Sequence, residues 1–230
     1  MTTSAADRAP TGNALQLVLT AERLFATHGI DGVSLRQISA DAGSGNNSAV
    51  HYHFGSKQGL IAAIFRYRLP QLINERRMLA ARCDPDDLRS RVEAHFLPVF
   101  TLADTPGTHY VSFVEQLQRH DLGSDDTLLA LPPEGLRSAE DFRHDLDRLL
   151  VHLDDPLRQM RITEAQSLCI HAAADRERAI TAGSASTPFE LYVNAFFDGL
   201  TGFLTGPPSA ATTRRLGQAP EPDRSNLRAL

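Results

Sequence analysis

The sequence has few of the cysteines that build disulfide frameworks and thiolate metal sites. It contains no tryptophan and two cysteines, Cys83 and Cys169, which lie far apart and in no zinc-ligand spacing. This pattern fits free thiols in a reducing compartment. The nucleophile motif GxSxG, the P-loop, the dinucleotide-binding glycine pattern and the zinc motif HExxH are all missing. We therefore expect no enzyme, and we predict no catalytic residue, metal ion or cofactor.

Long apolar runs are missing as well. The most apolar late segment, Phe189–Leu204, contains Glu190, Asn194 and Asp198, which makes it too polar for a membrane span. The first residues show no basic-then-apolar secretion signal. The net charge of −5 does not by itself indicate a nucleic-acid-binding protein, although such binding depends on a local patch and not on the total. We expect a soluble cytoplasmic protein without a membrane partner.

The sequence does contain helical periodicity. Apolar residues recur at three- and four-residue spacing through most of the chain, and no strand-like alternation is found. We predict an all-α protein of about nine helices, with a three-helix head at the N-terminus. The predicted organisation is a disordered leader at 1–10, a helix-turn-helix DNA-binding domain at 11–56, a larger helical domain at 57–205 and a disordered tail at 206–230.

Residues 33–60 begin with a well-defined helix start. Ser34 and Gln37 form an S-x-x-Q capping box. The apolar residues on either side of the cap, Val33 and Ile38, suit a hydrophobic staple, which sets the angle at which the chain enters the helix. The first helix of a motif is therefore predicted to begin at this serine.

In the same stretch the predicted helix ends, and a new helix begins, twice. Gly43 is predicted to end the first helix, and Asn46 or Asn47 to cap a short second one. Gly55 follows the short helix, and Ser56 caps a long third helix. A helix, a glycine turn and a short helix in this order indicate a helix-turn-helix motif.

A helix that reads the major groove needs one packed face and one polar face. Val50 and Phe54 are four residues apart and are predicted to pack inward. The outward side of the short helix then carries Asn47, Ser48, His51 and Tyr52, and His53 lies at its edge.

Phosphate contacts are predicted at two helix starts. Lys57 lies in a first turn, where a cation opposes the helix dipole unless an anion docks beside it. Ser34 opens the other helix, with Arg36 next to it. Four basic and four acidic residues balance within residues 1–60, so we expect modest non-specific DNA affinity, because phosphate neutralisation supplies most of that affinity.

With these residues the chain resembles the TetR family of bacterial transcriptional regulators. The resemblance covers about residues 12–65, and the remainder is similar in helical content and length. The matching pieces are Ala21-Glu22-Arg23-Leu24-Phe25, Gly29-Ile30, Ser34-Leu35-Arg36-Gln37-Ile38, Ala42-Gly43 and His51-Tyr52-His53-Phe54-Gly55-Ser56-Lys57.

The resemblance implies a homodimer that binds a near-palindromic operator in double-stranded DNA. It further implies repression as the default and release by a small-molecule effector of unknown identity. The turn from Gly43 to Asn46 is one residue longer than the commonest form, and Ala49 replaces the usual small polar contact residue. The predicted DNA-binding residues are Ser34, Arg36, Asn46, Asn47, Ser48, Ala49, His51, Tyr52, His53 and Lys57.

The resemblance also assigns residues 57–205 to ligand binding and dimerisation. Apolar and small residues on two late helices are the predicted dimer interface: Leu168, Ala172, Tyr192, Ala195, Phe196, Gly199, Leu200 and Phe203. Effector pockets are mostly apolar with few polar groups. The candidate pocket residues on the middle helices are His95, Phe96, Phe100, Phe113 and Phe142.

Two other classes of function stay open. Asp141, His144 and Asp145 share a helix face and suit acid–base or metal chemistry, although salt bridges to Arg148 are the simpler use. The near-neutral head also fits a helical protein-interaction module, or a metal-sensing regulator, with weak or no DNA binding. DNA-binding measurements separate these alternatives from an operator-binding regulator.

Overall fold

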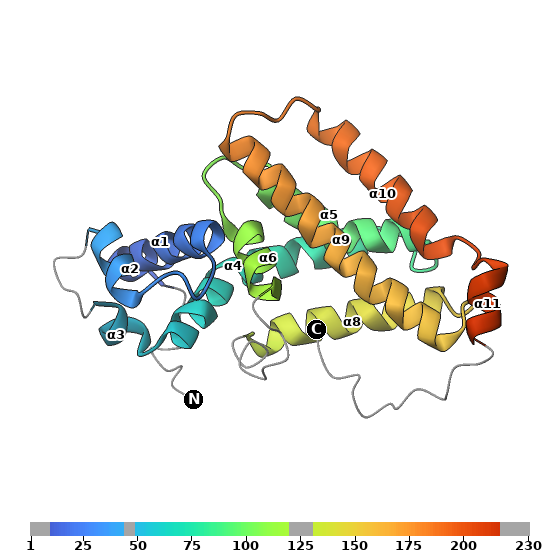
Figure 1. Ribbon diagram of the computed structural model, residues 1–230, viewed down its shortest axis with the longest axis horizontal. Helices are drawn as coiled ribbons and strands as arrows, with labels where there is room; N and C mark the ends of the chain where they lie inside the picture. The colour runs from blue at the N-terminus through green and yellow to red at the C-terminus, as the bar shows by residue number, and fades with distance from the viewer. Residues whose placement is uncertain (1–9, 44–48, 120–130, 217–230) are drawn as a thin grey trace.

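The computed structural model describes residues 10–43, 49–119 and 131–216. Within these ranges the chain forms ten helices and no strand, which confirms the all-α prediction. Figure 1 shows α1 to α3 gathered at one end, a larger body at the other, and α4 leading from one to the other. The helices are α1 (Gly12–His28), α2 (Leu35–Asp41), α3 (Ala49–Phe54), α4 (Lys57–Ala80), α5 (Leu88–Ala103), α6 (Tyr110–Arg119), α8 (Pro133–Leu149), α9 (Asp155–Thr181), α10 (Phe189–Thr205) and α11 (Ala210–Leu216).

Helix α11 lies where a disordered tail was predicted, so that prediction was wrong for residues 210–216. The Ser209 hydroxyl accepts a hydrogen bond from the Thr212 N–H at 3.2 Å, as a capping serine does. Leu216, at the end of this helix, packs against the apolar core. The prolines before Ser209 end α10 without preventing a new helix from starting. Residues 1–9 and 217–230 lie outside the described ranges.

The head forms as its helix signals predict. The Ser34 hydroxyl accepts a hydrogen bond from the Gln37 N–H at 3.2 Å, which confirms the cap of α2. Val33 and Ile38, on either side of the cap, are both buried. Gly43 follows α2 with a φ of 67°, a left-handed conformation that glycine adopts without steric cost. The capped start and the glycine stop together give α2 its short length.

Helix α4 connects the head to the body over 24 residues, a length of about 36 Å at 1.5 Å per residue. The Ser56 hydroxyl accepts a hydrogen bond from the Gly59 N–H at 3.0 Å and caps its start. Leu60 and Ile64, near this start, are fully buried, and Leu72 and Ile73 further along are buried as well. One helix therefore contributes buried residues to the cores of both parts.

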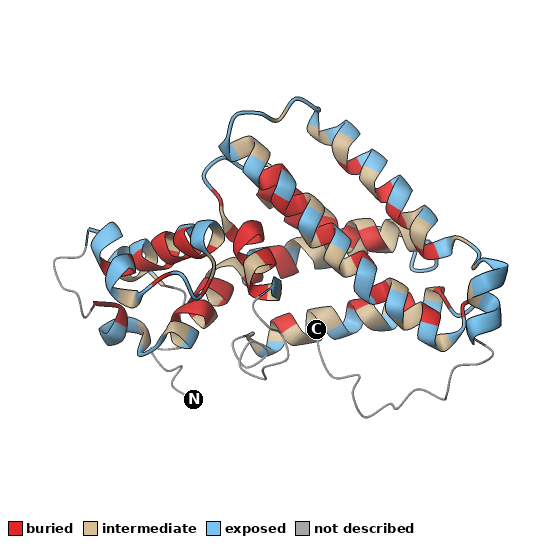
Figure 2. Cartoon of the chain, in the orientation of Figure 1, coloured by how far each residue is buried: buried red, intermediate tan, exposed pale blue. Residues whose placement is uncertain are grey.

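A continuous apolar core runs from the head into the body. Figure 2 shows its buried residues on the sides of α1, α6, α5 and α9 that face one another. Phe113 on α6 lies between the head and α4, with ring centroids 6.1 Å from Phe25 and 5.7 Å from Phe65. Phe100 on α5 packs against Phe196 and Phe197 of α10, with centroids 5.1 and 5.5 Å apart. These two phenylalanines therefore join helices to one another.

Candidate DNA-binding face and ligand cavity

The short helix α3 presents a row of polar aromatic side chains to solvent. His51, Tyr52 and His53 are all exposed, and Tyr52 has 84% of its surface accessible. The Tyr52 and His53 rings meet edge to face with centroids 5.0 Å apart. Val50 is fully buried beneath them, as its spacing from Phe54 predicted. The outward side of α3 is therefore accessible to another molecule.

Ala49 lies on the packed side of the same helix. Only 5% of its surface is exposed, so its side chain is part of the core and does not face solvent. Its inclusion among the DNA contacts is therefore corrected, because both of the first two residues of α3, Ala49 and Val50, are buried. Asn46, Asn47 and Ser48 lie outside the described residues, and their predicted contacts stay predictions.

Lys57, the only lysine in the sequence, donates a hydrogen bond to the Ile30 carbonyl oxygen at 2.9 Å. This bond ties the start of α4 to the loop that follows α1. It helps to explain how a cation is tolerated at a helix N-terminus, because a carbonyl oxygen compensates for the unfavourable dipole. An ammonium group has three N–H donors, so Lys57 keeps donors for a phosphate. Arg36 is exposed and Ser34 caps α2 close by in sequence.

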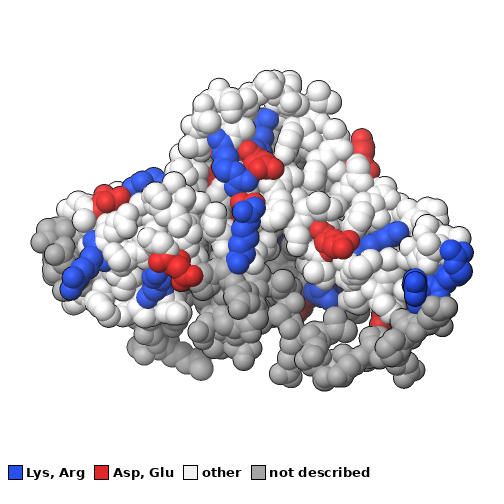
Figure 3. Space-filling view, in the orientation of Figure 1, with Lys and Arg blue, Asp and Glu red and all other residues white. Residues whose placement is uncertain are grey.

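The charge balance of the head changes once burial is considered. Glu22 is 1% exposed and pairs with Arg68 of α4, whose Nε and terminal nitrogen donate to the two carboxylate oxygens at 2.8 and 2.7 Å. Its negative charge is therefore neutralised inside the protein. Arg23 and Asp41 form an exposed pair at 3.3 Å. Over the head, at the left of Figure 3, acidic side chains lie next to basic ones.

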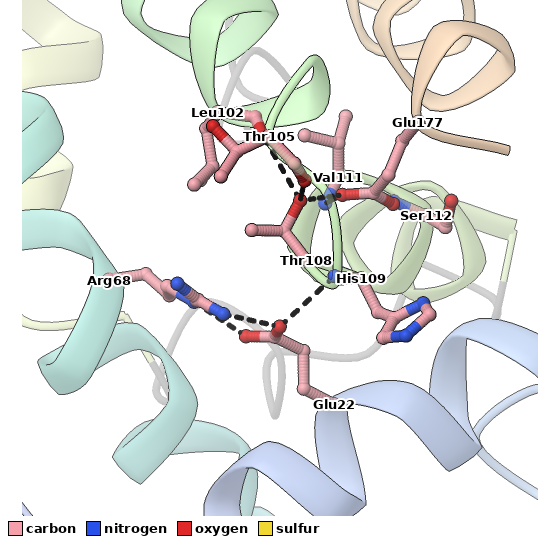
Figure 4. A network of polar contacts seen from close by, with 9 residues as sticks. All are labelled: Glu22, Arg68, Leu102, Thr105, Thr108, His109, Val111, Ser112 and Glu177. Atoms are coloured by element: carbon pink, nitrogen blue, oxygen red, sulfur yellow. Dashed lines mark hydrogen bonds and ion pairs between the residues drawn. The ribbon is translucent and has the colours of Figure 1, made fainter. Parts of the chain in front are cut away.

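Two buried carboxylates hold the start of α6. Glu177 of α9 accepts hydrogen bonds from the N–H groups of Val111 and Ser112 at 3.1 and 2.8 Å, and Glu22 accepts one from the His109 N–H at 3.3 Å. Figure 4 shows the two acids approaching this helix start from opposite sides, one from α1 and one from α9. Negative groups are favoured at a helix N-terminus. Helix α6 is thereby fastened to the head and to the long helix α9 at once.

A mostly apolar cavity of about 190 Å³ lies between α4, α5, α6, α8 and α9. We call it the inner cavity. Tyr110, Val111, Val114 and Leu117 give it a wall along α6. Gly135 of α8 lets that helix approach closely, because a Cβ atom there would lie 2.9 Å from the Leu69 side chain. The helix that is fastened to the head therefore also lines the cavity.

The predicted pocket residues are only partly brought together. His95 and Phe96 line the inner cavity. Phe142 stacks on His95 with centroids 3.9 Å apart and lines a neighbouring space of about 290 Å³, which we call the outer cavity. Phe100 and Phe113 line neither cavity in the described part of the chain, and their proposed pocket role is corrected: they pack between helices.

Arg76 was missed by the sequence reasoning, although a signal for it exists. It follows Leu69, Leu72 and Ile73 at helical spacing, so a charged residue interrupts an apolar stripe. Arg76 and His95 line both cavities. Burial lowers the pKa of His95 well below 6.5, and the charges of Arg76 and Arg91 lower it further, so its imidazole is neutral. Burial likewise raises the pKa of Tyr110.

The neutral state of His95 predicts a loss of stability in acid. In the unfolded chain a histidine binds a proton below pH 6.5, whereas folded His95 does not, so lowering the pH favours the unfolded state. Between pH 6.5 and 5.5 the contribution amounts to about 1 kcal/mol. We expect His95→Phe, which keeps a ring against Phe142, to remove this part of the pH dependence. Urea unfolding of the unmodified protein and of His95→Phe at the two pH values measures the free energy of unfolding. An equal loss of stability in both proteins would contradict a neutral His95.

Helices α9 and α10 carry apolar and small residues that are exposed in the single chain. Leu168 has 45% of its surface accessible, and Leu191, which was not predicted, has 61%. Ala195 and Gly199 are exposed on α10, and a Cβ atom added at Gly199 would meet no atom within 4 Å. The remaining predicted residues Ala172, Tyr192, Phe196 and Phe203 are half-buried.

Leu200 is the exception in the predicted dimer interface. Only 4% of its surface is exposed, and it belongs to the apolar core of this chain. The prediction of a partner contact for Leu200 is therefore corrected. Its neighbour Gly199 points to a different side of α10, since adjacent residues on a helix do not face the same way.

One acid of the alternative acid–base group on α8, Asp145, takes part in an ion pair, and so does the neighbouring Arg148. Asp145 pairs with Arg91 of α5, and Arg148 pairs with Asp86 at 2.5 Å. The expected salt bridges to Arg148 thus involve a different partner, because α5 and its preceding loop lie beside α8. Within residues 10–43, 49–119 and 131–216, no group of three or more potential ligand side chains is arranged to hold a metal ion. No helix in the same ranges is long and apolar enough to cross a membrane.

Comparison with known proteins relates the N-terminal helices to a protein family and the fold to solved structures. Residues 17–64 match the family model described as bacterial regulatory proteins, tetR family. No curated protein matches the sequence.

Solved structures match the chain over most of its length. It is similar to a transcriptional regulator from Rhodococcus sp. Rha1, with a TM-score of 0.56 and 19% identity, over 85% of this chain and 97% of that one. A TetR-family transcriptional regulator from Streptomyces coelicolor matches with a TM-score of 0.52 and 19% identity, over 84% of this chain and 94% of that one. The fatty acid degradation regulator FadR from Bacillus halodurans matches with a TM-score of 0.54 and 15% identity, over 86% of this chain and 98% of that one. At these identities the likeness concerns the fold.

Proposed function

We propose that this protein is a DNA-binding repressor. The proposal is supported by residues 17–64, which match the tetR family model, and by a fold similar to that of solved transcriptional regulators, one of them of the TetR family. The protein acts as a homodimer in the cytoplasm, binds a near-palindromic operator with two heads, and is released by a small-molecule effector. A two-fold symmetric dimer places its two reading helices about one or more duplex turns apart, roughly 34 Å per turn.

The single observation that carries this proposal is the form of α3. His51, Tyr52 and His53 project into solvent from a helix whose other side is anchored by the buried Val50. Hydrogen-bonding side chains on a rigid helix that fits the major groove are what base readout requires. The capped start of α2 adds backbone N–H groups for a phosphate, as helix N-termini commonly do.

Selection of bound sequences from a random double-stranded DNA library tests the proposal. We expect enrichment of one near-palindromic site, and fluorescence anisotropy on that site should show saturable binding at physiological salt. The absence of any enriched site, together with no measurable binding at low salt, would favour the helical interaction module instead.

Two substitutions separate base readout from phosphate binding. We expect His51→Ala to relax base preference, at a cost of about 1–3 kcal/mol on the preferred operator and little on other DNA. We expect Arg36→Ala to weaken binding to all sequences about equally and to reduce the slope of the salt dependence by about 1, because one phosphate is no longer neutralised. Anisotropy titrations on the operator and on a scrambled duplex at several salt concentrations distinguish base readout from phosphate binding. Equal loss of specificity from both changes would contradict the assignment.

Release by an effector requires a path from the cavity to the head. Helix α6 lines the inner cavity, and its first N–H groups are held by Glu22 of α1 and by Glu177 of α9. A ligand that binds one position of α6 more tightly than another changes the position of α1 with it. Effector control then follows from the different affinities of the ligand for the two head arrangements.

A further inference from the structure

Arg76 is a half-buried cation of α4 that lines both cavities. Its Nε donates to the His95 carbonyl oxygen at 2.9 Å, and one terminal nitrogen donates weakly to the Ser138 hydroxyl at 3.4 Å. In the described part of the chain no acidic side chain pairs with it. A guanidinium has five N–H donors, so three are left for other partners.

Two other arginines of the interior are each matched by an acid. Arg68 pairs with Glu22 at 2.7 Å, and Arg176 pairs with Asp104 at 2.6 Å. Removing a charge from water is costly unless a partner compensates it. Arg76 is half-buried and has no acidic partner among the described residues, so part of this cost stays uncompensated. Burial lowers the pKa of Arg76, in the direction expected for a cation that lacks a counter-ion.

The surroundings of Arg76 are polar on one side and apolar on the other. The outer cavity is lined by four arginines and two aspartates, a formal charge of +2, and one of those aspartates, Asp145, is already paired with Arg91. The inner cavity continues from Arg76 along Leu69, Phe96 and Val99. Neutral His95 beside it adds no competing charge. A negative group placed at Arg76 therefore has an apolar space of about 190 Å³ next to it.

We propose that the effector is a small organic carboxylate with an apolar body. This inference rests on the proposed role of the inner cavity as the effector site. The carboxylate accepts charge-assisted hydrogen bonds from the free donors of Arg76, and the apolar body extends between α4, α5 and α6. The cavity is smaller than the roughly 300–1,000 Å³ of drug-sized sites, which favours a ligand of medium chain length.

Binding of octanoate and of 1-octanol, measured by isothermal titration calorimetry on the full-length protein, tests the proposal. The two probes share an apolar chain and differ in the charged group. A hydrogen bond to a charged group contributes about 1.5–3 kcal/mol, so we expect octanoate to bind roughly 10- to 100-fold more tightly. Arg76→Met should abolish this preference and leave octanol binding in place, whereas Arg76→Lys should retain part of it.

Arg77→Met is the matched control, because Arg77 is the next residue on α4, is exposed and lines only the outer cavity. It should keep the full preference for octanoate. Equal binding of the two probes by the unmodified protein, or a preference that survives Arg76→Met, would overturn the proposal. If Arg76→Met does not fold, the unmodified protein and Arg76→Lys still decide it.

This outcome is independent of the proposed DNA-binding function, because the titration contains no DNA. Operator binding without selective octanoate binding would overturn the carboxylate site alone. Selective octanoate binding by a protein that binds no DNA would support the site and reject the repressor.

Discussion

Gly199→Arg is expected to convert the protein from a dimer into a monomer and to weaken operator binding by about 10²- to 10⁴-fold. The loss follows from avidity, because two linked heads bind far more tightly than one. The subunit itself should stay folded, since a Cβ atom at Gly199 meets no atom within 4 Å. Glycine inside a helix is also less favourable than arginine by up to about 1 kcal/mol. Sedimentation velocity and anisotropy on the same samples measure both effects.

Two controls sharpen this experiment. Val151→Arg places the same charge at a residue that is 74% exposed and lies between α8 and α9, outside the predicted interface, and should leave the dimer intact. Gly199→Ala adds only a methyl group and should have a much smaller effect than arginine. If Gly199→Arg remains a dimer with unchanged DNA affinity, α10 does not form the interface.

Glu22→Ala is expected to destabilise the protein by about 3–5 kcal/mol. The substitution leaves Arg68, with 15% side-chain exposure, without its bidentate carboxylate, and removing one partner of a buried ion pair costs that much. It also frees the His109 N–H at the start of α6. Chemical denaturation monitored by circular dichroism gives the free energy of unfolding. A cost below about 1 kcal/mol would show that the pair is not important for stability.

Arg23→Ala on the same helix is the control, because the pair of Arg23 with Asp41 is exposed and such pairs contribute about 0.2–1 kcal/mol. The double change Glu22→Leu with Arg68→Met removes both charges and should recover most of the lost stability. The recovered protein should bind DNA but respond less to an effector, since the link from α1 to α6 is then missing.

Local signals were sufficient wherever the interacting atoms lie within one helical turn. Ser34 and Ser56 cap α2 and α4 through N–H groups three residues later, and Gly43 takes up its left-handed conformation after α2. The spacing of Val50 and Phe54 correctly left His51 and Tyr52 on the exposed side of α3. In each case the partner lies on the same short segment, so the sequence order already places the two groups together.

The tertiary structure alone decided the contacts between distant segments. Glu22 meets Arg68 across 46 positions, Lys57 meets Ile30 across 27, and Glu177 meets Ser112 across 65. Helical periodicity shows which face of a helix is apolar but not which helix covers it. For that reason Leu200 was assigned to the partner subunit, although it packs within its own chain.

The sequence by itself thus determined the all-helical fold and the head that presents α3. It also determined that the exposed face of α3 carries no lysine or arginine, since residues 49–54 contain none. The packing of α4 against α5 decided that Arg76 lies between two cavities, where no acidic side chain of the described residues pairs with it. Burial of a charge depends on the helices that surround it, and those helices are brought together only when the whole chain folds.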